Sequence, residues 1–563
     1  MAHKRTPRTI STPFKRNQTR ARAPSGRAFA LSVPYAQRSE ASAHGARWSK
    51  EHGVFVYWGE QLPEALKPWA SRPYSLERRV ERALNPKTPT KRGGGATSTI
   101  TPRPHQEVGI RAIRASARAG HGGFLLADDV GLGKTITAWQ AILETPRVKT
   151  ALIVCPLAVV AHWRRTIEAM GDGGRDVLIL NYERVSKLFT VKKGVKTRTQ
   201  KGLAKYGKAP DFDVVVWDES HRCKNPTTAR AKFAAKLNAK AGFVLWLSAT
   251  AGQNPLELSY LAPLLARITG DRPGELKDFE AWCLKQGLGV QRGDYGRWEW
   301  RGDPADCEKV RAMLFDGRVP AGIRRRPQDI AGWPEINRVL IPIALEGRAR
   351  QLYGEAWTAF REELALEARG RDPRCALAAM LRFRQKGSLL RVPGTIDLVM
   401  ELLENGHQVA ISVAFIETLE AIWEGLERHL SDGACAAIHG QLSAAEKEQE
   451  RLRFQRGQAQ VVLFTVEEGI SLHQGEQLSE TERGSDTPRS EVIHDLRWSA
   501  IQMAQIEGRC HRDGNFAQMY WTFADDTIEE RIAQIVCGRI QSMKGMVGDD
   551  VETIREIGRL LEL

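Results

Sequence analysis

The stretch DDVGLGKT, from Asp128 to Thr135, holds the side chains that point most directly to a chemical role. A loop that leaves a strand and enters a helix directs backbone N–H groups and the positive end of the helix dipole to one point. Gly131 and Gly133 would let a polyphosphate approach the backbone closely. Lys134 would then reach its β- and γ-phosphates, and the Thr135 hydroxyl would hold a Mg²⁺ ion that bridges them. ATP is therefore the first ligand that the sequence indicates, and a Gly-rich turn without function is the plainer alternative.

An acid pair follows the apolar run near residues 213–217. Asp218 and Glu219 end the sequence DVVVWDE, which predicts a buried strand. Ligands of open α/β sheets lie at the carboxyl ends of the strands. Asp218 would there hold Mg²⁺ through water, and Glu219 would orient the water that attacks the nucleotide. A strand that ends in an acidic turn without function gives the same pattern.

Further polar residues could complete such a site. Gln106 precedes a helical pattern, and its amide has the donor and the acceptor needed to read an adenine edge. Ser248 and Thr250 would link the nucleotide to a moving neighbour, or would only bond to local backbone. Arg509 and Arg512 stand one helical turn apart and would act as arginine fingers on the γ-phosphate, although pairs of surface arginines are common.

The net charge of +16 is concentrated in two segments. Residues 1–30 carry eight Lys or Arg and no acid, and residues 184–208 carry nine and no acid, which accounts for the whole excess. Such segments are typical of arms that bind a polyanion, or of solvated tracts without function.

Composition narrows the class of protein further. The eight cysteines form no C-x-x-C pair, so neither a zinc site nor a disulfide framework is predicted. No run of about 18 apolar residues occurs, and the first thirty residues lack an apolar core typical of a secretory signal. We expect a cytoplasmic protein without a membrane partner, associated with the nucleoid if the source is bacterial or a phage.

Periodicity predicts an α/β chain of several domains, as its length of 563 residues requires. Short apolar runs alternate with helical patterns, which is typical of parallel sheets. Strands are predicted near 123–126, 150–155, 213–217, 243–247, 408–412, 460–464, 491–495 and 518–523. The predicted segments are a disordered basic tail (1–28), a small α+β module (29–84), a linker (85–99), an ATP-binding lobe (100–254), a helical insertion (255–387), a second lobe (388–525) and a C-terminal helical segment (526–563).

The small module 29–84 is rich in aromatic residues. We predict a strand, a short helix over 39–43, a turn at Gly45 and a hairpin-like pair through Trp48 and 54–58. Its Trp and Tyr side chains would either fill the core of so small a unit or serve as platforms on which bases stack.

Together, ten motifs resemble those of the Snf/Swi family of helicase-like ATPases, within helicase superfamily two. They are PRPHQ (102–106), LADDVGLGKT (126–135), IVCPLAVVAHW (153–163), NYE (181–183), WDESHRCKNP (217–226), LSATAGQN (247–254), IRRRP (323–327), HGQLS (439–443), VEEGISL (466–472) and QIEGRCHRDG (505–514). Asp128 replaces the first glycine of the loop, which is a habit of that family, and it is expected to bind ATP together with Gly131, Gly133, Lys134 and Thr135. The compact plan is nearest to its annealing-helicase (HARP) branch.

The resemblance implies two RecA-like lobes that clamp ATP and Mg²⁺ between them. Lys134 and the acid pair would lie on one lobe, and Arg509 and Arg512 on the other. Ala251 stands where the family usually has proline, residues 466–469 are more acidic than usual, and 473–490 is a polar insertion.

The function that follows is a DNA-stimulated ATPase that translocates on double-stranded DNA, forked or branched forms included, and remodels DNA structures or protein–DNA complexes. One alternative is a strand-separating helicase. A second is an ATPase that remodels a protein, acting on RNA polymerase. A DNA-binding scaffold with a decayed ATPase would lack the lysine, the acid pair or an arginine finger, and none is missing.

Overall fold

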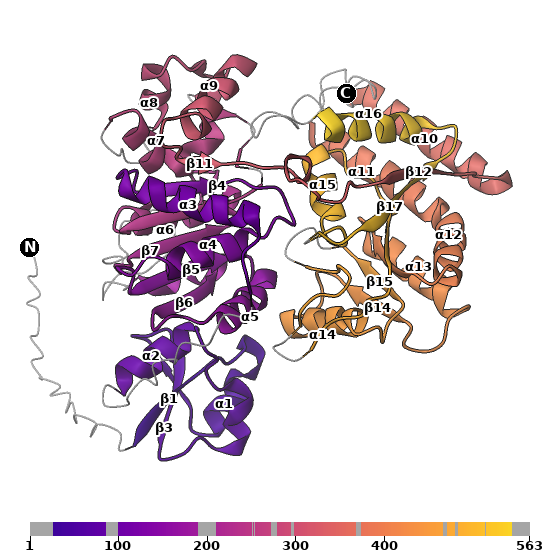
Figure 1. Cartoon of the computed structure of the whole chain (residues 1–563). Coiled ribbons are helices and arrows are strands. Elements are labelled where there is room, and N and C mark those ends of the chain that lie inside the picture. Colours follow the sequence, from indigo (N-terminus) through magenta and orange to yellow (C-terminus); the bar gives the residue numbers. More distant parts are fainter. Residues whose placement is uncertain are drawn as a thin grey trace, which may run out of the picture. The chain divides into compact units, whose positions relative to one another are not determined.

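In this computed structural model the chain separates into two units, Met1–Pro89 and Thr90–Leu563 (Figure 1). The residues described are 26–85, 100–189, 210–249, 251–252, 254–271, 279–293, 298–367, 373–465, 470–478, 482–512 and 514–542. Several segments that the sequence analysis named lie outside the described residues. They are the basic tail up to residue 25, most of the linker 85–99, most of the basic segment 184–208, Thr250, the acidic stretch 466–469 and the chain beyond 542.

The first unit is a three-stranded antiparallel sheet with two α-helices. Its elements are β1 (Arg27–Leu31), α1 (Arg38–Ala43), β2 (Arg47–Ser49), β3 (Val54–Gly59) and α2 (Leu76–Leu84), with 3₁₀ turns at Tyr35–Gln37 and Glu64–Trp69. The strand order is β1-β3-β2. Gly45 takes a φ of +88°, which a side chain disfavours, and turns the chain from α1 into β2. Leu31, Phe55, Leu66 and Trp69 form the centre of its core.

The first lobe of the second unit is a six-stranded, fully parallel sheet in the order β11-β4-β8-β7-β5-β6. Its strands are β4 (Gly123–Leu126), β5 (Thr150–Cys155), β6 (Asp176–Asn181), β7 (Val214–Asp218), β8 (Phe243–Leu247) and β11 (Gly322–Ile323). Its helices are α3 (Pro104–Arg118), α4 (Lys134–Leu143), α5 (Val160–Met170), α6 (Ala229–Asn238), α7 (Ala262–Ile268), α8 (Phe279–Lys285) and α9 (Pro304–Phe315). The central strands are continuous apolar runs because helices cover both faces of such a sheet.

The second lobe repeats this plan, with a parallel sheet in the order β12-β17-β16-β13-β15-β14. Its strands are β12 (Arg338–Ile343), β13 (Gln408–Ser412), β14 (Cys435–Ile438), β15 (Val461–Phe464), β16 (Arg489–Ile493) and β17 (Ala517–Ala524). Its helices are α10 (Gly347–Glu367), α11 (Pro373–Leu390), α12 (Val392–Glu404), α13 (Ile416–Glu427), α14 (Ala444–Gln455), α15 (Ala500–Glu507) and α16 (Ile528–Ser542). The predicted fold class, two parallel-sheet lobes, is confirmed, and every predicted strand of the two lobes is present within two residues.

The segment 255–387, which we had predicted to be a helical insertion, also contains strands. It holds the hairpin β9 (Val290–Arg292) and β10 (Trp298–Trp300), and it supplies β11 to the first sheet and β12 to the second. Both β11 and β12 lie at the edge of their sheet. Edge strands bury less of their surface, so β11 is too short and β12 too exposed to give a clear apolar run.

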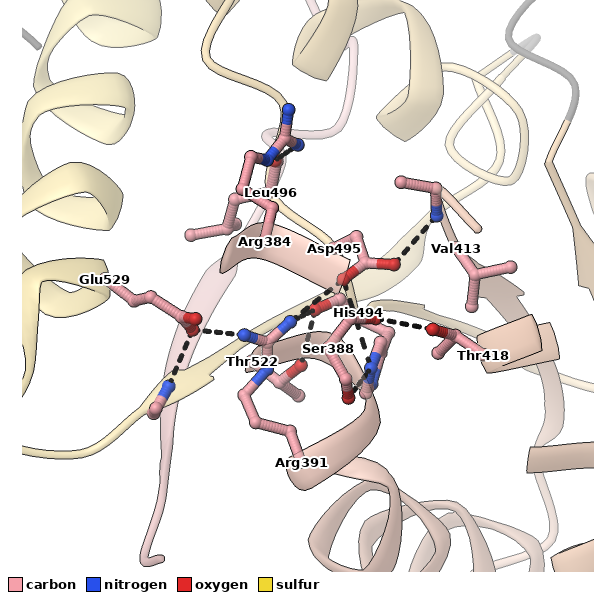
Figure 2. A network of polar contacts seen from close by, with 12 residues as sticks. Arg384, Ser388, Arg391, Val413, Thr418, His494, Asp495, Leu496, Thr522 and Glu529 are labelled. Atoms are coloured by element: carbon pink, nitrogen blue, oxygen red, sulfur yellow. Dashed lines mark hydrogen bonds and ion pairs between the residues drawn. The ribbon is translucent and has the colours of Figure 1, made fainter. Parts of the chain in front are cut away.

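A buried polar network stabilises the second lobe (Figure 2). Arg391, at the start of α12, donates to the carbonyl oxygen of His494 at 2.7 Å and forms ion pairs with Asp495 and Glu529. Asp495 also accepts the N–H of Ala414 at 2.8 Å. Burial lowers the pKa of His494 to about 4, so this side chain is neutral. The network joins the carboxyl end of β16 to α12 and α16, and it pairs the charge of Arg391 with those of Asp495 and Glu529.

Candidate nucleotide site

The loop between β4 and α4 has the geometry of a phosphate cradle. Gly131 and Gly133 have φ values of +86° and +75°, which favour glycine. A Cβ atom at Gly133 would also overlap with Nε2 of Gln106. Lys134, the first residue of α4, donates to the carbonyl oxygens of Asp128 at 2.8 Å and Asp129 at 3.3 Å. The ammonium group is therefore held over the loop, where a polyphosphate would meet it.

Arg325, from the segment after β11, fixes the start of this loop. Its Nε donates to Oδ1 of Asp128 at 3.0 Å, its Nη2 donates to Oδ2, and its Nη1 donates to the carbonyl oxygen of His105. The Asp128 side chain is fully buried, so this ion pair is shielded from solvent. Gly109 leaves the space for Arg325, since a Cβ there would lie 2.9 Å from Nη2. Asp128 thus shapes the loop through Arg325, and a direct contact between Asp128 and the nucleotide stays a prediction.

Asp218 and Glu219 lie at the carboxyl end of β7, as predicted for a strand-end acid pair. The indole N–H of Trp163 donates to Oδ2 of Asp218 at 2.8 Å, and the Tyr182 hydroxyl donates to the Asp218 carbonyl oxygen at 2.8 Å. Glu219 has a φ of +53°, which is rare for a side chain of its size. Trp163 and Tyr182 hold the carboxylate and the strained turn in place.

The two carboxyl groups have different electrostatic surroundings. Burial, followed by the neighbouring charge of Glu219, raises the pKa of Asp218. Burial also opposes the ionised form of Glu219, but its hydrogen bond with His221 and the charges of His221, Lys134 and Arg509 lower the pKa of Glu219. Glu219 is therefore the firmly ionised member of the pair, as a residue that orients water requires.

His221 joins this pair to the turn after β8. Its Nδ1 lies 3.0 Å from Oγ of Ser248 and 3.3 Å from Oε2 of Glu219. Ser248 was predicted to link the nucleotide site to a neighbour. In the structure it contacts His221, which in turn contacts Glu219 of the acid pair. His221 itself was not predicted to have a role, because its position in the motif does not show which side chains surround it.

Gln106 lies against the loop, with both ends of its amide in use. Its oxygen accepts the backbone N–H of Arg103 at 2.8 Å, and its Nε2 donates to the carbonyl oxygen of Leu132 at 3.3 Å. His105 bonds to the same oxygen at 3.0 Å. These contacts support the loop, and adenine recognition by Gln106 stays a prediction.

The two predicted arginine fingers belong to the segment after α15. Arg509 is buried, donates to the carbonyl oxygen of Ile470 at 3.3 Å, and is close enough to Glu219 to lower its pKa. Arg512 is near the loop, since a Cβ atom at Gly131 would lie 3.4 Å from Cγ of Arg512. The residues predicted from both lobes are thus brought to the same place.

The donor set suits Mg²⁺. This ion keeps several waters and is usually bound by one or two carboxylates together with substrate phosphates. The predicted ligands are the Thr135 hydroxyl, at the start of α4, and the buried Asp218 carboxylate. Both belong to the loop and strand end that hold Lys134 and Glu219, so a hydroxyl and a carboxylate are available at the position where the phosphates are expected.

Comparison with known proteins gives two family matches. A model described as "SNF2-related domain" matches residues 105–372, and one described as "Helicase conserved C-terminal domain" matches residues 394–514. Together they cover every predicted site residue and every strand of the two lobes except β17.

Individual relatives are distant. The chain is 24% identical over 448 residues to the Bos taurus "SWI/SNF-related matrix-associated actin-dependent regulator of chromatin subfamily A-like protein 1", which is 78% of this chain and 44% of the relative. It is 22% identical over 554 residues to the "Uncharacterized ATP-dependent helicase YqhH" of Bacillus subtilis. That alignment covers 90% of this chain and 91% of the relative. This chain thus spans less than half the length of the Bos taurus relative. A solved structure titled "Sulfolobus solfataricus SWI2/SNF2 ATPase core in complex with dsDNA" aligns at 19% identity and a TM-score of 0.33, over 84% of this chain and 99% of that one.

Among the described residues, no helix is long and apolar enough to cross a membrane.

Proposed function

Since the chain belongs to the SWI/SNF (Snf/Swi) family of helicase-like ATPases, we propose that it hydrolyses ATP when bound to double-stranded DNA and moves along the duplex. The observation that carries this proposal is the common edge of one parallel sheet: Lys134 follows β4 at the start of α4, and the acid pair ends β7, with only β8 between the two strands. A phosphate-binding lysine beside a strand-end acid pair is the minimum apparatus for hydrolysis of a nucleoside triphosphate.

Each residue has a role in the proposed reaction. Lys134 and the N-terminus of α4 bind the β- and γ-phosphates. Mg²⁺, held by Thr135 and Asp218, would neutralise charge that builds up on the phosphate oxygens. Glu219 orients the attacking water, because its carboxylate is ionised and turned out of the strand by its positive φ. His221 keeps Glu219 in that position.

Arg509 and Arg512 would complete the site from the second lobe. A finger of this kind is worth about 10³–10⁵ in rate in comparable ATPases and GTPases. Because these arginines and Lys134 come from different sheets, hydrolysis depends on the arrangement of the two lobes, and this dependence supports a motor rather than a simple phosphatase.

Movement along the duplex without strand separation is the finer part of the proposal. Separating strands costs about 1.4 kcal/mol of stacking per base-pair step, so a helicase needs a rigid wedge at the fork. The polar insertion 473–490 has a single antiparallel bridge among its described residues, between Gln477 and Arg483. The first lobe has the short hairpin of β9 and β10, which the sequence had not indicated. That hairpin is the best candidate for a wedge if the helicase alternative holds.

The basic tail 1–28 and the basic segment 184–208 are proposed to bind DNA phosphates. Deleting either should weaken DNA binding and reduce the log–log salt slope by about 0.9 for each duplex phosphate that the variant no longer binds. An unchanged slope would mean that the segments are solvated and take no part.

The primary test is the ATPase rate without nucleic acid and with duplex DNA, single-stranded DNA, forked DNA and RNA. Stimulation by blunt duplex is expected. Lys134→Ala or Glu219→Gln should abolish hydrolysis and leave DNA binding intact, and normal turnover in either variant would remove the assignment. If no nucleic acid stimulates the enzyme, the remodelling of a protein becomes the leading alternative, and stimulation by RNA polymerase then tests it.

Translocation is tested with a triplex-forming oligonucleotide on duplex DNA and, separately, with a forked duplex, each with ATP. Displacement of the third strand without release of a fork strand is expected. Efficient unwinding of the fork with no displacement of the third strand would favour the helicase alternative.

A further inference from the structure

The first unit exposes two large aromatic rings that share one arginine. The side chains of Tyr35 and Trp48 are 83% and 41% exposed. The guanidinium carbon of Arg38 lies 4.7 Å from the centroid of the Tyr35 ring and 5.1 Å from that of Trp48. Phe55 and Trp69 are buried, so the core of this small unit already has its aromatic bulk. Folding alone therefore does not account for the exposure of Tyr35 and Trp48.

The secondary structure holds these side chains in defined positions. Tyr35 begins the 3₁₀ turn before α1, and Arg38 is the first residue of α1. Trp48 is the central residue of β2 and lies directly opposite Phe55 of β3, with an edge contact between the rings at a centroid distance of 5.3 Å. Because Phe55 is buried, it anchors Trp48 to the core while much of the Trp48 ring remains in solvent.

The surroundings of the two rings are positively charged. Arg38 has no acidic partner among the residues that the structure describes, and its Nε is buried without a hydrogen-bond partner there. Arg47 and Lys50, on either side of Trp48 in the chain, are exposed and form no ion pair within the described ranges. The nearby acids Glu40 and Glu51 are exposed too, and neither forms an ion pair within the described ranges.

We propose that Tyr35, Arg38 and Trp48 form a stacking surface for unpaired nucleotides, with Arg47 and Lys50 as contacts for the phosphates. Aromatic rings and arginine planes bind bases through their faces, and this recognition tolerates every sequence because every base has such a face. A single-stranded nucleic acid is therefore the occupant that matches both the exposed rings and the cations beside them. This site is additional to the nucleotide site and does not depend on ATP hydrolysis.

The preference for unpaired bases follows from stacking. In a duplex each base face is covered by its neighbours, so Tyr35 and Trp48 could touch only the ends of a helix. The surface would therefore bind single strands, gaps and forks more tightly than blunt duplex DNA. The motor lobes, by contrast, are proposed to bind duplex. A chain with both properties would favour junctions between paired and unpaired DNA.

The test uses the full chain and a fluorescent oligothymidylate, with a blunt duplex as the second probe. Tyr35→Ala and the double variant Tyr35→Ala/Trp48→Ala are compared with Phe516→Ala, which removes another exposed ring, 47% exposed, from the second lobe. Loss of a base–aromatic stack should weaken single-strand binding at least about fivefold per ring, and more when the ring is fully engaged. Affinity for the blunt duplex should change by less than about twofold, since phosphate contacts dominate there.

Tyr35→Ala keeps the test valid if the double variant misfolds, because Tyr35 is almost fully exposed. A second readout is photocross-linking of an oligonucleotide that contains 5-iodouracil, followed by mass spectrometry. Adducts on Tyr35 or Trp48 are expected. The proposal would be overturned if the variants bound both probes equally more weakly, if they bound the single strand as well as the unmodified protein does, or if adducts were confined to the motor lobes. Unchanged binding of all nucleic acids would indicate that this surface binds a protein partner instead.

The outcome is separable from that of the proposed function. Lys134→Ala should keep the single-strand affinity while it loses hydrolysis, and Tyr35→Ala should keep the ATPase rate on blunt duplex. Loss of duplex stimulation in the unmodified protein would contradict the motor and leave the stacking surface untouched.

Discussion

Arg325→Ala should disable the nucleotide loop although Arg325 need not touch the nucleotide. The substitution removes both guanidinium donors and the ion-pair partner of the fully buried Asp128 carboxylate. Removal of one partner from a buried ion pair costs about 3–5 kcal/mol. If the whole cost appears as a loss of the ATP-binding conformation of the loop, ATP affinity would fall by up to about 10²- to 10³-fold, because 1.4 kcal/mol corresponds to each factor of ten.

Arg326→Ala is a matched control one residue along the chain. Its guanidinium pairs with Asp329 within the same turn, and both side chains are 30% or more exposed. Exposed pairs of this kind are worth about 0–1 kcal/mol. Arg326→Ala should therefore bind ATP within a few-fold of the unmodified protein.

The assay is a titration with a fluorescent ATP analogue, together with urea unfolding followed by circular dichroism. The double variant Asp128→Ala/Arg325→Ala should be less impaired than Arg325→Ala, because it leaves no buried charge without a partner. Additive effects of Asp128→Ala and Arg325→Ala, or an Arg325→Ala variant that behaves like Arg326→Ala, would refute this reasoning.

Three further predictions concern other buried groups. Trp163→Phe should lower the ATPase rate about 10- to 100-fold, since a hydrogen bond to the charged Asp218 is worth about 1.5–3 kcal/mol, and an unchanged rate would exclude this role. Arg391→Ala should destabilise the second lobe by about 3–5 kcal/mol in urea unfolding because Asp495 loses its buried partner; an effect below about 1 kcal/mol would contradict that. Burial raises the pKa of Glu491 from 4.5 to about 8, so the folded protein loses stability as pH rises across that interval. Glu491→Gln should flatten the dependence of the unfolding midpoint on pH, and an unaltered slope would reject the assignment.

The sequence predicted those parts of the fold that have a local pattern of their own. Strands β4, β5, β7 and β8 are uninterrupted apolar runs, and their predicted bounds agree with the structure within one residue. The edge strands β11 and β12 were missed because their place in a sheet comes from a distant partner and not from their own pattern. Periodicity reports burial, and β12 is only partly buried. The other two edge strands, β6 and β14, were also not predicted, although most of their residues are buried.

The site divides in the same way. Lys134, Asp218 and Glu219 could be predicted from the sequence because a loop or a strand end determines their position. Arg325 lies within the motif IRRRP but was not predicted to have a role, since its partner Asp128 is 197 residues away. Trp163 reaches Asp218 across 55 residues. Contacts of this length depend on the packed tertiary structure, and no local spacing indicates them.

The segment between β11 and β12 has a mechanical consequence. β11 belongs to the sheet of the first lobe and β12 to that of the second, so residues 324–337 are the tether between them. The same tether supplies Arg325 to Asp128 and Arg324 to Asp129, at the mouth of the phosphate loop. A movement of the second lobe that displaces β12 is therefore transmitted through the backbone of the tether to Arg324 and Arg325. This transmission does not require side chains between the lobes to repack. The segment that limits how far the two lobes can separate thus also holds the loop in which ATP is expected to bind.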